Sequence, residues 1–153
     1  MPINYFLSSI VCYFGLLLGI YLIKFAPEEQ KPGAKYFVFM KKILLLLMIA
    51  FFLFFHKLNI ILIFVILFLV SFVLSYKKAV LEKSALVYFF LGIIFFFSSK
   101  IENLFIIESV LIFLYGVPTA SLDVKLKTKN YLRILSKNLL FFAPIIFLYF
   151  LFN

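Results

Sequence analysis

The sequence has few of the residues that build soluble domains or disulfide scaffolds. It contains no tryptophan, one cysteine and one histidine, and charged residues make up only 14% of its 153 residues. Soluble domains carry about 25% charged residues, and a chain of this size leaves much of its surface exposed. The low charge therefore excludes an ordinary water-soluble domain. The single cysteine, Cys12, excludes a disulfide framework within the chain.

The sequence consists mostly of apolar residues. They account for 67% of the sequence, and the mean hydropathy is +1.22. This content also excludes intrinsic disorder, which requires few large apolar side chains. The apolar residues form continuous runs rather than alternating with polar ones, which favours membrane-spanning helices over a β-barrel. We therefore predict an integral membrane protein.

The predicted fold is an all-α, polytopic membrane bundle of six transmembrane helices that forms one domain, 1–153, with no soluble domain. A helix needs roughly 20 mostly apolar residues to cross a bilayer. The predicted spans are about 3–23, 36–55, 60–76, 80–99, 104–122 and 139–152. Two prolines and a glycine predict a non-helical loop over 26–33. Lys41 and Lys42 are predicted to extend outward from the second span to the interface.

The basic residues predict an orientation for these six spans. The connections 24–35, 77–79 and 123–138, with the span ends next to them, carry 13 of the 15 basic residues, while Lys57 and Lys100 lie on the opposite side. Basic residues collect in the cytoplasmic loops of membrane proteins. We therefore expect a cell-membrane location with these three connections in the cytoplasm and both termini outside.

Apart from Glu82 in the first turn of the fourth predicted span, Glu108 is the one acidic residue inside a predicted apolar span. Charges at such positions are expensive and commonly mark functional sites. One interpretation is a structural ion pair at the outer rim with Lys57 or Lys100. The other is a role in transport or binding, in which Tyr115 and Thr119 extend a polar stripe along the same helix face.

Two further patterns indicate packing and lipid contacts. Gly15 and Gly19 form a G-x-x-x-G motif, which lets two helices approach closely within the chain or between copies. A second pattern repeats a basic residue every fourth position and fits either an interfacial helix that contacts anionic lipid head groups or an orienting loop. Its members are Lys125, Lys129, Arg133 and Lys137.

The motifs of common enzymes and metal sites are missing. His56 and Cys12 fall on different predicted elements, and no nucleophile or phosphate-binding motif is present. We therefore expect no metal site, no cofactor and no nucleic-acid partner, and we consider enzymatic activity unfavoured, with lipid processing the weakest interpretation. The preferred one is a structural or accessory subunit that packs with itself or with a larger membrane complex. The alternative is a small transporter or channel that uses Glu108.

Overall fold

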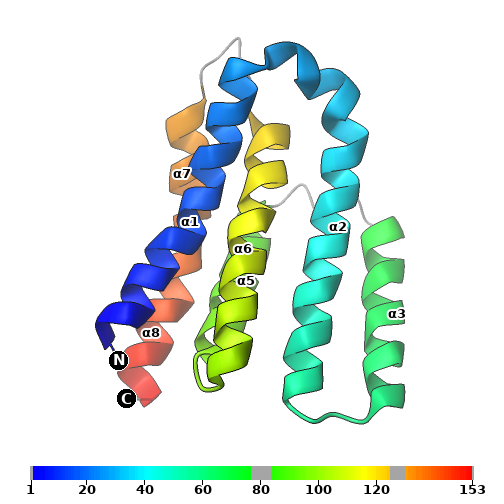
Figure 1. Cartoon of the computed structure of the whole chain (residues 1–153), viewed down its shortest axis with the longest axis vertical. Helices are drawn as coiled ribbons and strands as arrows, with labels where there is room; N and C mark the ends of the chain where they lie inside the picture. Colours follow the sequence, from blue (N-terminus) through cyan, green and yellow to red (C-terminus); the bar gives the residue numbers. More distant parts are fainter. Residues whose placement is uncertain (1, 77–83, 125–129, 153) are drawn as a thin grey trace.

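The computed structural model of the chain describes residues 2–76, 84–124 and 130–152. Every regular element in these residues is helical (Figure 1). The long helices are α1 (Pro2–Phe25), α2 (Gln30–Phe55), α3 (Ile60–Tyr76), α5 (Ser84–Ser98) and α6 (Glu102–Asp123). The last segment consists of α7 (Tyr131–Asn138), the 3₁₀ turn η3 (Leu139–Phe141) and α8 (Phe142–Phe152). The predicted all-α bundle is confirmed.

Four of the helical segments are long and apolar enough to cross a membrane. These are Ile3–Phe25, Pro27–Phe55, Glu102–Asp123 and Tyr131–Phe152. The apolar helices Ile60–Leu74 and Ser84–Ser98 are shorter. Residues 77–79 and 80–83, a predicted connection and the start of the predicted fourth span, lie outside the described residues.

The connection between the first two helices differs from its prediction. A 3₁₀ turn, η1 (Pro27–Glu29), follows α1, and α2 already begins at Gln30. The prediction of a non-helical loop over 26–33 is therefore wrong. Pro32 fits in the first turn of α2, because the backbone N–H groups there have no partner within the helix. The Gln30 side chain donates hydrogen bonds to the backbone oxygens of Ser121 and Val124, which holds the end of α6.

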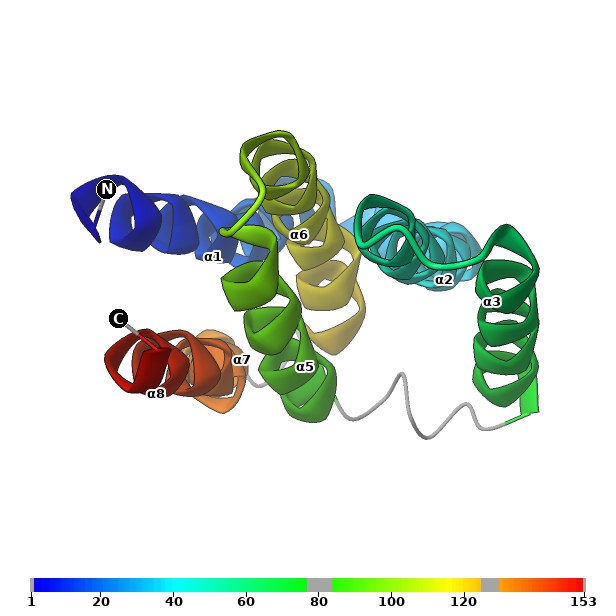
Figure 2. The ribbon, with the colours of Figure 1, turned by 90° about the horizontal axis from the view of Figure 1, so that it is seen from below.

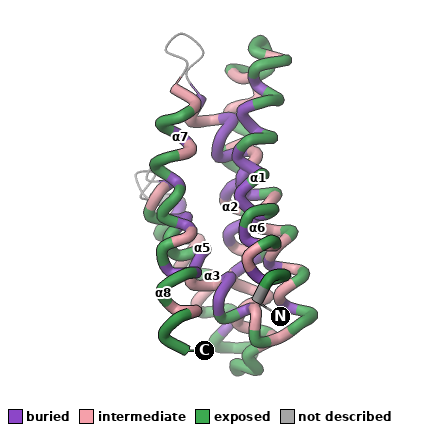
Figure 3. Tube along the Cα trace, turned by 90° about the vertical axis from the view of Figure 1, so that its left-hand side faces the viewer, coloured by how far each residue is buried: buried purple, intermediate pink, exposed green. Residues whose placement is uncertain are grey.

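The helix α6 occupies the centre of the bundle. It packs between α1 and α2 and also contacts α5, which in turn packs against α8 (Figure 2). The helix α3 packs against α2 at the edge of the bundle. Buried residues follow the inner sides of the helices, and exposed residues cover the outer sides and the ends (Figure 3). Because the outer sides are apolar, this arrangement suits a bundle surrounded by lipid.

The two ends of the bundle differ in their connections. The N-terminal end of α1, the C-terminal end of α8 and the turns at 56–59 and 99–101 lie together at one end. The connection through η1 and the end of α6 lie at the other end. We call the end with the η1 connection the basic end, because Lys24, Lys31 and Lys35 lie there.

Candidate functional site

Three buried polar side chains share one face of α6. Glu108, Tyr115 and Thr119 lie on this face, and all three have an exposed fraction of 0%. Their spacing of seven and four residues places them above one another along the helix. Pro118 does not interrupt α6, which continues to Asp123. The Thr119 hydroxyl donates to the backbone oxygen of Tyr115 at 2.8 Å, so its one donor is used within the helix.

Glu108 lies in the interior and not at the rim. Both of its carboxyl oxygens are buried and have no hydrogen-bond partner among the described residues. Lys57 is exposed in the turn after α2, and the Lys100 Nζ lies 5.1 Å from the centre of the Phe96 ring. Within the described residues neither lysine pairs with Glu108. The structure therefore does not form the rim ion pair that the sequence offered as one explanation.

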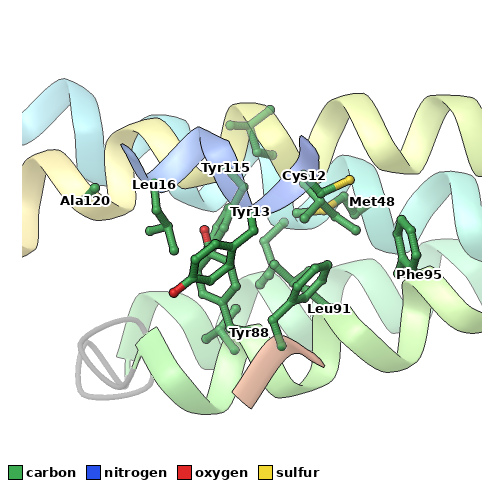
Figure 4. Packing of buried hydrophobic residues seen from close by; sticks show 14 of the residues in the cluster. Cys12, Tyr13, Leu16, Met48, Tyr88, Leu91, Phe95, Tyr115 and Ala120 are labelled. Atoms are coloured by element: carbon green, nitrogen blue, oxygen red, sulfur yellow. The ribbon is translucent and has the colours of Figure 1, made fainter. Parts of the chain in front are cut away.

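Tyr115 contacts polar side chains from two neighbouring helices. Its ring centre lies 5.9 Å from that of Tyr88 on α5, and the Lys41 Nζ of α2 lies 5.8 Å from the same Tyr115 ring. The hydroxyl groups of Tyr88 and Tyr115 are buried without a hydrogen-bond partner in the described part of the chain. In the close-up, Tyr13 of α1 lies beside this pair (Figure 4).

Lys41 does not extend to the surface as predicted. Its exposed fraction is 2%, because α2 turns this side chain toward α6. The prediction that Lys41 snorkels outward is therefore wrong, whereas the adjacent Lys42 is half-buried. A cation over an aromatic face is stabilised by the charge distribution of the ring.

Asp123 completes this group at the basic end. The Ser84 Oγ donates to its Oδ2 at 3.0 Å, and the charge of Asp123 also lies near Lys41. Five residues thus lie between the interior and the basic end, and we call them the polar column: Glu108, Tyr115, Tyr88, Lys41 and Asp123. They come from α2, α5 and α6.

The sequence predicted only part of this column. Glu108 and Tyr115 were identified from their spacing on one helix, but Tyr88, Lys41 and Asp123 were not. A weak signal was available, since Ser84 and Tyr88 are four residues apart and therefore share a helix face. This spacing does not tell which face of α5 packs against α6, because that depends on the tertiary structure.

The glycine motif lies at the closest approach of α1 and α6. A Cβ atom at Gly15 would lie 1.9 Å from the backbone oxygen of Phe113, and one at Gly19 would lie 2.3 Å from that of Val117. On the opposite side, a Cβ atom at Gly116 would lie 2.5 Å from the Gly15 backbone carbonyl carbon. These glycines therefore pack two helices of the same chain, backbone against backbone.

An open groove of about 430 Å³ lies beside this contact, on the outer face of α1 and α6. The Cys12 Sγ donates to the Ser109 backbone oxygen at 3.3 Å, while the Ser109 Oγ is buried without a partner among the described residues. The groove combines polar and apolar side chains: Asn4, Leu7, Ser8, Val11, Cys12, Ser109, Val110 and Phe113.

The basic repeat is only partly described. Lys125 and Lys129 lie outside the described residues, and Arg133 and Lys137 are exposed on α7. This helix continues through η3 into α8 and runs along the bundle rather than across its end (Figure 1). The Tyr13 hydroxyl donates to the backbone oxygen of Leu135, and Leu132 on the outer side is 83% exposed. Basic and apolar side chains are therefore presented together near the basic end.

Comparison with known proteins gives no relative. The chain matches no protein-family model, no curated protein and no solved structure. Among the described residues, no group of three histidine, cysteine or acidic side chains is close enough to hold a metal ion.

Proposed function

We propose that the chain is an integral membrane protein that crosses the bilayer six times. The four long apolar segments support this proposal directly. The helices α3 and α5 have 17 and 15 described residues, or about 25 and 22 Å at ~1.5 Å per residue. Their outward side chains are apolar, which suits contact with lipid better than with water.

In this proposal the basic end faces the cytoplasm. The sequence-based six-span topology puts 13 of the 15 basic residues on the side to which Lys24, Lys31 and Lys35 belong, and an excess of basic residues marks cytoplasmic loops. The N-terminal end of α1 and the C-terminal end of α8 are then both outside. Arg133 and Lys137 would contact anionic head groups of the inner leaflet, together with Lys125 and Lys129.

For its activity, we propose a small transport-type protein in which Glu108 binds and releases the transported cation or proton. The buried Glu108 carboxyl group without a protein partner is the observation that carries this proposal. A buried carboxyl group without hydrogen bonds costs free energy. A structural role at this position would be served better by an apolar side chain, so a function is the simplest reason for a carboxyl group.

The test is flux into vesicles that contain the purified chain. Glu108→Gln keeps the size of the side chain and removes its ability to ionise, so we expect loss of the transport that the unmodified chain supports. Glu102→Gln, on the exposed first turn of α6, is the matched control and should transport normally. Undiminished transport by Glu108→Gln would remove the basis of the proposal.

The groove between α1 and α6 supports a second candidate function, an accessory subunit of a membrane complex. Asn4 and Ser8 place polar groups on an outer face of the bundle, where hydrogen bonds to another helix would satisfy them. Ser8→Leu should then lower the mass of the assembly extracted from membranes, whereas Ser71→Leu on the peripheral helix α3 should not. A chain that is extracted strictly as a monomer would contradict this candidate.

A further inference from the structure

Four of the seven buried side-chain atoms that lack a hydrogen-bond partner among the described residues belong to Glu108, Tyr115 and Tyr88. The other three belong to Ser98, Ser109 and Asn138. Glu108 lies about two turns from Tyr115 along α6, and Tyr115 contacts Tyr88 across to α5. The two carboxyl oxygens and both tyrosine hydroxyl groups are buried without a hydrogen-bond partner in the described residues. Three neighbouring side chains thus share the same unusual state, and together they lead from the interior toward Asp123.

The surroundings of Glu108 favour a proton over a metal ion as the species bound. Hard cations such as Ca²⁺ and Mg²⁺ require about six to eight oxygen ligands. In the described part of the chain, Glu108 belongs to no group of three histidine, cysteine or acidic side chains that could hold a metal ion. A proton requires a single oxygen atom, and its binding to Glu108 also removes a buried charge.

We propose that Glu108 is the innermost proton-binding group of a proton path. This path runs through the hydroxyl groups of Tyr115 and Tyr88 to Asp123 at the basic end. This inference rests on the proposed transport function and names the proton as its substrate. It also assigns a role to Tyr88, which the sequence did not identify.

The transfer conserves protons at every step. The Glu108 carboxylate accepts a proton and becomes neutral. It then releases this proton to a chain of bridging water molecules, which is needed because Glu108 and Tyr115 are about 10 Å apart along the helix axis and each hydrogen bond spans only about 2.8 Å. Each tyrosine oxygen accepts one proton while its own hydroxyl proton moves to the next oxygen, so no tyrosinate forms. Asp123 receives the last proton and releases it to solvent.

The titratable groups around the path fit proton movement from Glu108 toward Asp123. The neighbouring helices present Cys12 and Tyr13 from α1, Lys41 from α2 and Tyr88 from α5. Asp123 is half-buried at the basic end and accepts a hydrogen bond from Ser84, so its carboxylate joins the interior to solvent. The positive charge of Lys41 beside Tyr115 opposes an additional resting proton there, which suits a site of passage rather than of storage.

The experiment measures proton uptake with a pH-sensitive dye in vesicles that contain the full chain, driven by a potassium diffusion potential. We expect proton uptake by the unmodified chain, none by Glu108→Gln, and at least a tenfold reduction by Tyr88→Phe and by Tyr115→Phe. Each phenylalanine keeps the ring contacts and removes only the hydroxyl group. Tyr21→Phe, on the exposed face of α1, is the matched control and should behave like the unmodified chain.

The outcomes separate this inference from the function on which it rests. If Glu108→Gln loses proton uptake but both phenylalanine variants keep it, the tyrosine path is wrong and the transport function stands. If the chain moves another cation in a Glu108-dependent way but no protons, the inference is again overturned alone. If Glu108→Gln changes no flux, both fail.

Infrared difference spectroscopy on a pH change gives a readout that does not depend on flux. We expect a carbonyl band of a protonated carboxyl group that disappears in Glu108→Gln and shifts in Tyr115→Phe. A band that persists in Glu108→Gln would overturn the assignment of Glu108 as the proton-binding group.

Discussion

Two buried ionisable residues show how differently this bundle treats charge. The Lys41 side chain lies in the interior. Its ammonium group lies over the Tyr115 ring, and the ring face stabilises this charge. Glu108 is equally buried but has no hydrogen-bond partner in the described residues. Lys41 therefore contributes to packing as well as charge, while the unpartnered carboxyl group of Glu108 costs stability, which the proposed transport function would explain.

This difference predicts that removing the Glu108 carboxyl group stabilises the protein. Glu108→Leu replaces an unsatisfied buried polar group by an apolar one of similar size, and we expect a gain of about 1–3 kcal/mol in the free energy of unfolding. The measurement is unfolding of the purified chain in mixed micelles. Glu102→Leu, at an exposed position of the same helix, should leave the stability unchanged. A loss of stability in Glu108→Leu would show that the carboxyl group has a stabilising partner.

At the scale of elements, the contact between α1 and α6 fixes the bundle. The backbones meet at Gly15, Gly19 and Gly116, where no Cβ atom fits. Because this contact sets the rotation of α6, it also determines that Tyr115 faces Lys41 of α2 and Tyr88 of α5. The last segment shows a second local effect: Pro144 cannot donate to the carbonyl group four residues earlier, and the 3₁₀ turn η3 precedes it at Leu139–Phe141.

The glycine contact predicts a large effect from a single methyl group. Gly116→Ala would place its Cβ atom 2.5 Å from the Gly15 backbone. Since a backbone cannot move aside without separating the helices, we expect a loss of about 1–3 kcal/mol or more. Thermal unfolding in detergent measures this loss.

Gly33→Ala is the matched control for this variant. Its nearest neighbour would be the Phe37 ring at 3.1 Å, which is a side chain that can shift. Alanine is also favoured over glycine within a helix by about 1 kcal/mol. Stability should therefore stay the same or rise slightly. Equal losses in the two variants would mean that close backbone packing is not the cause.

At the scale of the whole molecule, the described loop residues place basic side chains at both ends of the bundle. Lys24, Lys31 and Lys35 lie at the basic end, and Lys57 and Lys100 lie in the turns at the other end (Figure 1). The proposed topology, with the basic end in the cytoplasm, is tested by finding on which side of the membrane each end lies.

The topology predicts opposite labelling of the two ends. Single cysteines at Lys31 and at Lys57, in a Cys12→Ala background, should react with a membrane-impermeant maleimide from opposite sides of the membrane. We expect labelling at position 57 in intact cells and at position 31 only after the cells are opened. Position 100 should behave like position 57. Labelling of positions 31 and 57 from the same side would contradict the proposed topology.

The sequence by itself determined that this protein is an apolar helical bundle, because hydropathy and helix length depend on neighbouring residues along the chain. It also pointed to Glu108, since one acidic residue in an apolar run is visible without a fold. It failed at residues 26–33, where proline suggested a loop but fits the start of a helix. Only the tertiary structure decided that Tyr88, Lys41 and Asp123 join Glu108 and Tyr115. The physical reason is that side chains on different helices meet according to helix rotation and relative height, and close contacts such as that at Gly15 and Gly116 set both.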